Sequence, residues 1–146
     1  MATVFDTIEK SFDNAKESLG IGSTIFAVKP GDGSAREQAA SCQKVLGGWA
    51  NISNEYATKR YRSNCINWGI LPFTIAPDTP FDYNVGDCVF VPGIRKAILE
   101  GAEEIDAKVI TKDGVKPIHL FFQNLTADER QILADGCLMN YYKNRK

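Results

Sequence analysis

STIFAVKPGDGSAREQAASCQKVLGGWANI, residues 23–52, is the stretch of the chain that decides its fold. The apolar residues of Ser23–Val28 predict a short buried strand, which a Pro-Gly pair brings to an end. A helix is predicted to begin at Ser34, and Trp49–Ile52 has the composition of a second strand. The residues spaced to form the inner face of this helix are Ala35, Ala39, Cys42 and Leu46. A strand, a helix and a strand joined by short connections indicate two parallel strands with a helical crossover.

The rest of the chain extends this pattern into a mixed sheet. A third helix is predicted over about Ala57–Trp68, and the strand Ile70–Phe73 follows it. The inner face of that helix would be Ala57, Tyr61, Cys65 and Trp68. The second half of the chain predicts a loop at Pro77–Asp87, a strand at Cys88–Val91 and a helix at Ile94–Leu99. A hairpin of Ile105–Thr111 and Val115–Phe122 is predicted around the turn Asp113-Gly114. A last helix is predicted from the capping box Thr126–Glu129 to about Tyr142.

At the start of the chain, residues 1–20 predict an amphipathic helix. Its apolar stripe consists of Phe5, Ile8, Phe12, Ala15 and Leu19. The fold class is therefore α/β, and we predict a single domain over residues 1–146 in which helices flank a mixed β-sheet.

Composition and charge are those of an ordinary globular protein. Hydrophobic residues make up 44% of the 146 residues and charged residues 24%, which supplies enough apolar surface for a core. The formal net charge of −1 gives no overall field that would attract nucleic acid or an anionic membrane. No apolar run approaches the roughly 20 residues of a membrane span, and no signal-peptide pattern opens the chain, so we expect a cytoplasmic protein.

The cysteines and the histidine form no recognisable metal or catalytic motif. The cysteines are spread along the chain without a C-x-x-C pair, at Cys42, Cys65, Cys88 and Cys137. We therefore expect buried, inert thiols and no metal bound by this chain. His119 lies within an apolar run and is expected to be a strand residue. With one histidine in the sequence, neither a Ser/His/Asp triad nor a histidine metal site can be built.

The turn Gly31–Glu37 (GDGSARE) allows two interpretations. Ser34 and Glu37 have the spacing of a capping box, in which each side chain accepts a hydrogen bond from the other residue's backbone N–H. Alternatively the turn receives an anion, because it leads from a strand into a helix N-terminus and its glycines permit close approach. A cation such as Arg36 in the first helical turn is disfavoured by roughly 0.3–1 kcal/mol, and a bound carboxylate would resolve that conflict. The residues alone support both interpretations about equally.

GDGSAREQAASCQKVLGGWANI, followed by EYATKRYRSNCINWGILPF, resembles the C-terminal swivelling domain of the aconitase family. In that family a G-x-GSSRE-x-A turn begins a helix that ends in a Leu-Gly pair. A strand, a helix with a Ser-Asn or Thr-Asn pair, and a G-[LI]-LP strand follow. The counterparts here are Gly31–Ala39, Leu46-Gly47, Ser63-Asn64 and Gly69–Pro72. The spelling of these motifs is most similar to the bacterial aconitase-like branch of enzymes called hydratases. The resemblance implies a swivelling β/β/α domain with a mixed sheet, in agreement with the pattern above.

The resemblance also implies roles for four residues of the turn. Ser34 matches the serine whose alkoxide is the general base, and Arg36 matches the arginine that binds a substrate carboxylate. Gly33 and Ala35 lie beside them in the substrate-binding turn, and Ala35 stands where relatives have a second serine. Helix-end N–H groups and Arg36 would stabilise the deprotonated serine, which is otherwise a poor base.

The family reaction dehydrates and rehydrates a hydroxy di- or tricarboxylic acid, with the iron of a [4Fe–4S] cluster taking the hydroxyl. The cluster cysteines belong to other domains of the family, and the Asp-rich motif that precedes the turn in relatives has no counterpart here. We therefore expect part of a hydro-lyase of the hydratase type. It would bind no cofactor itself, be inactive alone and need a carboxylic acid substrate and cluster-bearing partner domains.

Two other hypotheses remain open. One is the small subunit of an isopropylmalate-isomerase-type enzyme. Two features argue against it: the missing Asp-rich motif and the N-terminal helix. The other is a non-catalytic relative that binds RNA through Lys59, Arg60 and Arg62. A solvated helix face explains this basic cluster more simply, so we expect no nucleic-acid partner.

Overall fold

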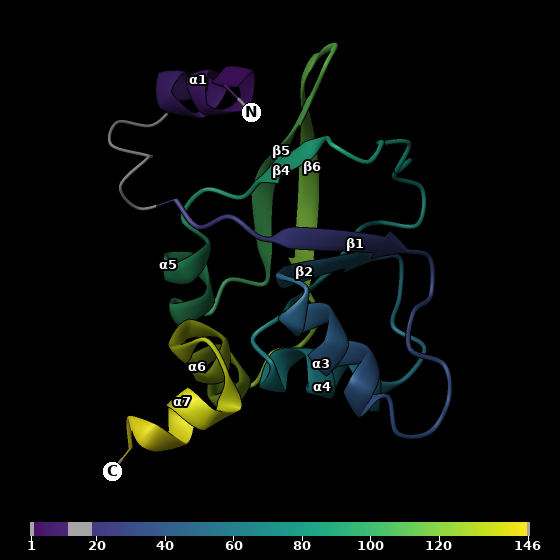
Figure 1. The fold of residues 1–146 in the computed structure, drawn as a ribbon, viewed down its shortest axis with the longest axis vertical. Helices are drawn as coiled ribbons and strands as arrows, with labels where there is room; N and C mark the ends of the chain where they lie inside the picture. Colours follow the sequence, from purple (N-terminus) through teal and green to yellow (C-terminus); the bar gives the residue numbers. More distant parts are fainter. Residues whose placement is uncertain (1, 12–18, 146) are drawn as a thin grey trace.

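The described part of the chain, residues 2–11 and 19–145 of a computed structural model, forms a six-stranded sheet in the order β1-β2-β3-β6-β5-β4. The strands that pair in parallel are β1 (Ser23–Ala27), β2 (Gly48–Ser53) and β3 (Leu71–Thr74). The antiparallel pairs continue through β6 (Gly114–Phe122), β5 (Glu104–Thr111) and β4 (Cys88–Phe90). The sheet is strongly twisted, so that β1 and β2 run nearly across β5 and β6 in Figure 1. The predicted mixed sheet is confirmed.

Helices α3 (Glu37–Val45) and α4 (Lys59–Asn67) form the crossovers between the parallel strands. They lie side by side over the β1–β2 part of the sheet (Figure 1). Ile52 of β2, Ile66 of α4 and Phe73 of β3 are each 1% exposed and join the layers in the core. The predicted order of strands and helices in this half is therefore confirmed. Of the predicted inner face of the third helix, Tyr61 and Cys65 are buried, and Ala57 and Trp68 are partly buried.

The second half consists of the β5–β6 hairpin and the helices α5 (Ile94–Leu99), α6 (Ala127–Asp135) and α7 (Leu138–Lys143). The predicted capping box is confirmed, because Thr126 Oγ1 accepts from the Glu129 N–H at 3.2 Å and Glu129 Oε2 accepts from the Thr126 N–H at 2.9 Å. The prediction of one last helix reaching Tyr142 is wrong. Gly136 ends α6 in the left-handed region, with a φ of 96°, and α7 starts after it.

Helix α1 (Ala2–Ser11) packs beside β4 and β5. Its Ile8 is buried against Ile110 of β5, and Cys88 and Phe90 of β4 border the same apolar cluster. The amphipathic helix is thus confirmed over Ala2–Ser11, and the predicted stripe residues Phe12 and Ala15 lie outside the described residues. The predicted extension to residue 20 is wrong at its end, because Leu19 and Gly20 are not helical. Within the described ranges, none of the helices combines the length and apolar character of a membrane span.

The predicted inner face of α3 is wrong. Its members, Ala35, Ala39, Cys42 and Leu46, are all exposed. The buried residues of α3 are Ala40 and Gln43. The physical reason is a polar pair, because Gln43 donates from Nε2 to Oδ1 of Asn51 on β2. This contact turns the amide side of the helix toward the sheet and its apolar side toward solvent.

The expectation of buried thiols is correct for Cys65 and wrong for the other cysteines, all of which lie in the described residues. Cys65 of α4 is buried, whereas Cys42 is exposed on α3. Cys88 and Cys137 have intermediate burial. The position of Cys42 follows from the rotation of α3 that its polar contact with β2 imposes.

Arg130 of α6 joins α5 to α6 from inside the fold, with only 9% of the residue exposed. Its Nη1 donates to the carbonyl oxygens of Ala102 at 2.7 Å and Ile98 at 3.4 Å. Its Nε donates to the Leu125 carbonyl at 3.3 Å. Ile98 lies in the last turn of α5, where its carbonyl also accepts from the Gly101 N–H at 3.3 Å, and Ala102 lies just after the helix. Arg130 is therefore a structural residue.

Replacing Arg130 with methionine should lower the free energy of unfolding by about 3 kcal/mol or more, because hydrogen bonds to a charged group contribute about 1.5–3 kcal/mol each. The matched control is Arg95→Met, since Arg95 lies on the exposed side of α5 and should tolerate the change within about 0.5 kcal/mol. Urea denaturation of the two variants provides the comparison. Equal losses of stability would contradict the role of Arg130.

Candidate active site

The loop of residues 28–36 connects β1 to α3 at the carboxyl end of the parallel strands. It is tied to the loop after β2, because the N–H groups of Asn54 and Glu55 donate to the Val28 carbonyl at 3.2 Å each and the Ala57 N–H donates to the Pro30 carbonyl at 2.9 Å. A hollow beside it is lined by Ile25, Ala27, Pro30, Asn51, Ile52 and Tyr61. In parallel sheets, ligands bind outside this edge.

Of the two interpretations of this turn, the capping box of Ser34 and Glu37 is wrong. The residue at the N-cap of α3 is Arg36, and no side chain caps the helix there. Glu37 instead accepts a hydrogen bond from Trp68 Nε1 at 2.6 Å, which ties the start of α3 to the end of α4. Ser34 is exposed two residues before the N-cap, and no hydrogen bond in the described part of the chain engages its hydroxyl. Helix capping therefore does not explain why Ser34 and Glu37 occupy this turn.

Three residues of the loop have a left-handed backbone. Gly31 and Gly33 have φ values of 90° and 106°, and Arg36 has a φ of 52°. A Cβ at Gly31 would overlap the Tyr61 ring, and a Cβ at Gly33 would overlap the guanidinium of Arg36. The Arg36 side chain therefore folds back over Gly33. For a residue with a side chain, the left-handed region costs about 1–3 kcal/mol, and such strain gathers at functional sites.

Side chains from the start of α4 hold the carbonyl groups of this loop. Thr58 Oγ1 donates to the Gly31 carbonyl at 3.0 Å, and Asn64 Nδ2 donates to the Ala35 carbonyl at 2.9 Å. Arg60 donates from Nη1 to the Ser34 carbonyl. Sequence reasoning did not single out these contacts. The Ser63-Asn64 pair was a motif of the resemblance, but no local pattern ties Arg60 to a residue 26 positions earlier.

A buried polar network lies behind the loop. Asn51 donates from Nδ2 to the Tyr61 hydroxyl at 3.1 Å and to Cys65 Sγ at 3.5 Å. Burial raises the pKa of Tyr61 to about 12 and the pKa of Cys65 to about 11. Both groups therefore stay protonated at neutral pH, and the Cys65 thiol is not a reactive nucleophile.

The other candidate residues lie elsewhere. His119 is on β6, where Asp106 Oδ1 is 2.7 Å from its Nδ1 and Glu104 Oε2 is 3.0 Å from its Nε2. These hydrogen bonds, that to Glu104 first, raise the pKa of His119. It is a strand residue, as predicted. Among the described residues, no group of three or more His, Cys, Asp or Glu side chains could hold a metal ion.

The basic cluster of α4 is divided between two contacts. Arg60 donates to the Ser34 carbonyl of the loop. Arg62 instead donates from Nη2 to the Gln123 carbonyl, and its Nη1 lies 3.3 Å from Glu129 Oε1. Both guanidinium groups therefore bind other parts of the chain. Lys59 and Arg60 are exposed, whereas Arg62 is partly buried.

Residues 3–78, which are 76 of the 146 residues, match the profile of the family described as the aconitase C-terminal domain. The chain belongs to this family. The matched range contains the whole loop and both helices, α3 and α4, that form its surroundings. The predicted resemblance is confirmed, and the chain is an aconitase swivel-type domain.

Individual relatives agree with this assignment. The methanogen homoaconitase small subunit of Methanocaldococcus jannaschii is 34% identical over 135 residues, which cover 92% of this chain and 69% of that protein. The 3-isopropylmalate dehydratase small subunit of Metallosphaera sedula is 33% identical over 77% of this chain and 60% of its own length. A putative mitochondrial aconitate hydratase of Emericella nidulans is 27% identical over 79% of this chain. The chain spans only 15% of that last relative.

A solved structure supports the same fold. The crystal structure of 3-isopropylmalate dehydratase from Methanocaldococcus jannaschii matches with a TM-score of 0.55 and 27% sequence identity. The match covers 92% of this chain and 71% of that chain.

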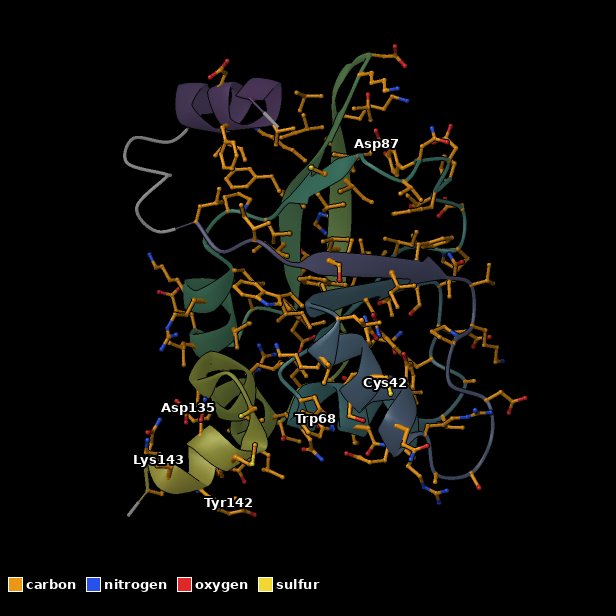
Figure 2. The ribbon with its side chains drawn as sticks, in the orientation of Figure 1. Cys42, Trp68, Asp87, Asp135, Tyr142 and Lys143 are labelled. Carbon is orange, nitrogen blue, oxygen red and sulfur yellow. The ribbon has the colours of Figure 1, made fainter. Side chains whose placement is uncertain are left out.

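Figure 2 places Cys42 on α3 and Trp68 near the end of α4, on the side of the sheet where the candidate loop meets these two helices.

The strain at Arg36 predicts an unusual order of stability among variants. Arg36→Gly should be more stable than Arg36→Ala by about 1 kcal/mol, because glycine adopts the left-handed region without the steric cost that a Cβ brings. Thermal or urea denaturation of the two variants measures the difference. An alanine variant as stable as the glycine variant would mean that the backbone at residue 36 is not held in this region.

Proposed function

We propose that this chain is the swivel domain of an aconitase-like hydro-lyase, a hydratase that acts on a hydroxy di- or tricarboxylic acid. In this proposal Ser34 is the general base and Arg36 binds a substrate carboxylate, with Gly33 and Ala35 beside them. The observation that carries the proposal is the strained, exposed loop at the carboxyl edge of the sheet in a chain of this family. It offers a free hydroxyl and a guanidinium side by side, and no structural role accounts for both.

The surroundings of Ser34 fit the task of a base. A serine hydroxyl loses its proton only where the alkoxide is stabilised, and backbone N–H groups together with a cation supply that stabilisation. The Arg36 guanidinium folds over Gly33 next to Ser34, and its fork can bind a carboxylate through two parallel hydrogen bonds. Ala35 offers no hydroxyl, so the substrate would have one fewer hydrogen-bond donor at this position than in relatives with a second serine.

The metal chemistry is proposed to belong to a partner. The cysteines of this chain do not fit a [4Fe–4S] cluster, because Cys65 is buried within α4 while Cys42 is exposed on α3. A cluster on the partner would supply the Lewis acid that takes the substrate hydroxyl. This chain would contribute the base and the carboxylate anchor, and would be inactive alone.

The outer ridge of α3 and its C-cap, formed by Ala39, Cys42, Val45 and Leu46, supports the existence of such a partner. Val45 is 83% exposed and Leu46 is 82% exposed. Exposed apolar residues that lie together, rather than singly, are typical of a contact surface. The ridge begins in the first turn of α3, directly after the two proposed site residues. A partner that covers Ser34 and Arg36 would therefore cover the start of this ridge. Two of the relatives are named small subunits, in keeping with a separate partner chain.

A second candidate function is that of the small subunit of an isopropylmalate-dehydratase-type enzyme. The relative from Metallosphaera sedula and the solved structure from Methanocaldococcus jannaschii carry that name, and both match most of this chain. Turnover of aconitate and of isopropylmalate by the same reconstituted pair separates the two candidates.

Ser34→Ala tests the proposed base. In a complex with the cluster-bearing partner, kcat should fall about 10²- to 10⁴-fold, because the step of proton abstraction loses its base. The free energy of unfolding should change little, since no hydrogen bond within the described residues depends on the Ser34 side chain. The matched control is Ser23→Ala at the exposed start of β1, which should keep full activity. A Ser34→Ala variant with the wild-type kcat would remove Ser34 from the mechanism.

Charges on the outer ridge of α3 should prevent assembly. The double variant Val45→Glu and Leu46→Glu should weaken binding to the cluster-bearing partner at least about tenfold, or about 1.4 kcal/mol, because it places charges in an apolar contact. The control is Val85→Glu, which changes a fully exposed valine in the loop before β4. Titration calorimetry gives both Kd values. Equal Kd values for the two variants would show that the partner does not use this ridge.

A further inference from the structure

We propose that α4 is a positioning platform for the loop, with Arg60 and Asn64 as the positioning residues. This inference rests on the function proposed above for Ser34 and Arg36. Its basis is that two neighbouring carbonyl groups of the loop are bound by side chains of one helix. Asn64 Nδ2 lies 2.9 Å from the Ala35 carbonyl oxygen, and Arg60 Nη1 donates to the Ser34 carbonyl.

The geometry of the peptide bond converts this hold into an arrangement of N–H groups. In a planar trans peptide, the carbonyl of one residue and the N–H of the next point in opposite directions. A Ser34 carbonyl directed at α4 therefore turns the Ala35 N–H away from α4. The Ala35 carbonyl is likewise directed at α4, so the Arg36 N–H also points away from α4. No hydrogen bond among the described residues engages either N–H.

Two successive N–H groups turned outward next to a free hydroxyl form a concavity that binds anions. The groups available to the substrate carboxylate or to the Ser34 alkoxide would thus be the N–H groups of Ala35 and Arg36, in addition to the Arg36 guanidinium. Arg60 adds a second effect. Its charge polarises the Ser34–Ala35 peptide and strengthens the Ala35 N–H as a donor.

The platform itself is firmly seated. Tyr61 and Cys65, on the adjacent face of the same helical turns, are 6% and 0% exposed. Thr58 caps the helix and also donates to the Gly31 carbonyl at 3.0 Å. The face of α4 that carries Asn64 is therefore fixed relative to the sheet. The left-handed backbone of Arg36 is kept by contacts that come from a rigid element.

The test compares Arg60→Gln and Asn64→Ala with the control Lys59→Gln, which changes an exposed neighbour on the same helix. With the full chain bound to its cluster-bearing partner and aconitate as the probe, kcat should fall about 10- to 100-fold in both positioning variants. The fall in kcat should exceed any rise in KM, because the lost interaction acts on the transition state. Arg60→Lys, which keeps a charged donor, should recover part of the loss. The control should match the wild type.

A second readout needs no partner. The amide resonances of Ala35 and Arg36 in the isolated chain should shift in both positioning variants and stay in place in Lys59→Gln. If these resonances do not move, α4 does not set the loop and the inference is overturned. If they move while kcat of an active complex is unchanged, the hold is structural and the inference is again overturned. A wild-type complex without turnover would instead remove the proposed function, and this inference with it.

Discussion

Side chains of α4 and its N-cap residue bind three carbonyl groups of the loop between β1 and α3. We infer that this hold keeps Arg36 in the left-handed region and the Ser34 hydroxyl in a fixed relation to the guanidinium. The helix depends in turn on the rest of the fold. Gly69 ends it so close to α6 that a Cβ there would overlap the carbonyl of Gly136. The site is thus connected through α4 to both β3 and α6.

Most of the fold was predictable from the sequence, because its signals are local. Apolar runs, glycine stops and the Thr126–Glu129 capping box marked the strands and helices, and Asp113-Gly114 marked the hairpin. Two of the failures, both at α3, have one cause in common. The outward rotation of α3 depends on the contact of Gln43 with Asn51, and the loss of the Ser34–Glu37 box depends on the contact of Glu37 with Trp68. Tertiary contacts of this kind leave no trace in local periodicity.

The position of the site in the chain was predictable from the sequence, but the hydrogen bonds that hold it were not. The motif around Ser34 and Arg36 located the loop, and the resemblance assigned it to a family that the comparisons bear out. The part of Arg60 could not be foreseen, because its target lies 26 residues away in the chain. Departures from the local rules gather here: a strained arginine, an exposed apolar ridge and a buried amide. Such conflicts concentrate at functional positions.

We propose that this chain contributes one half of an active site whose other half lies on a cluster-bearing partner. The most direct measurement is the aconitate hydratase activity of a fixed amount of that partner as increasing amounts of this chain are added. The account predicts no activity for either component alone and a rise to a plateau at one chain per partner. An absence of activity at every ratio, with both components folded and the cluster intact, would contradict it.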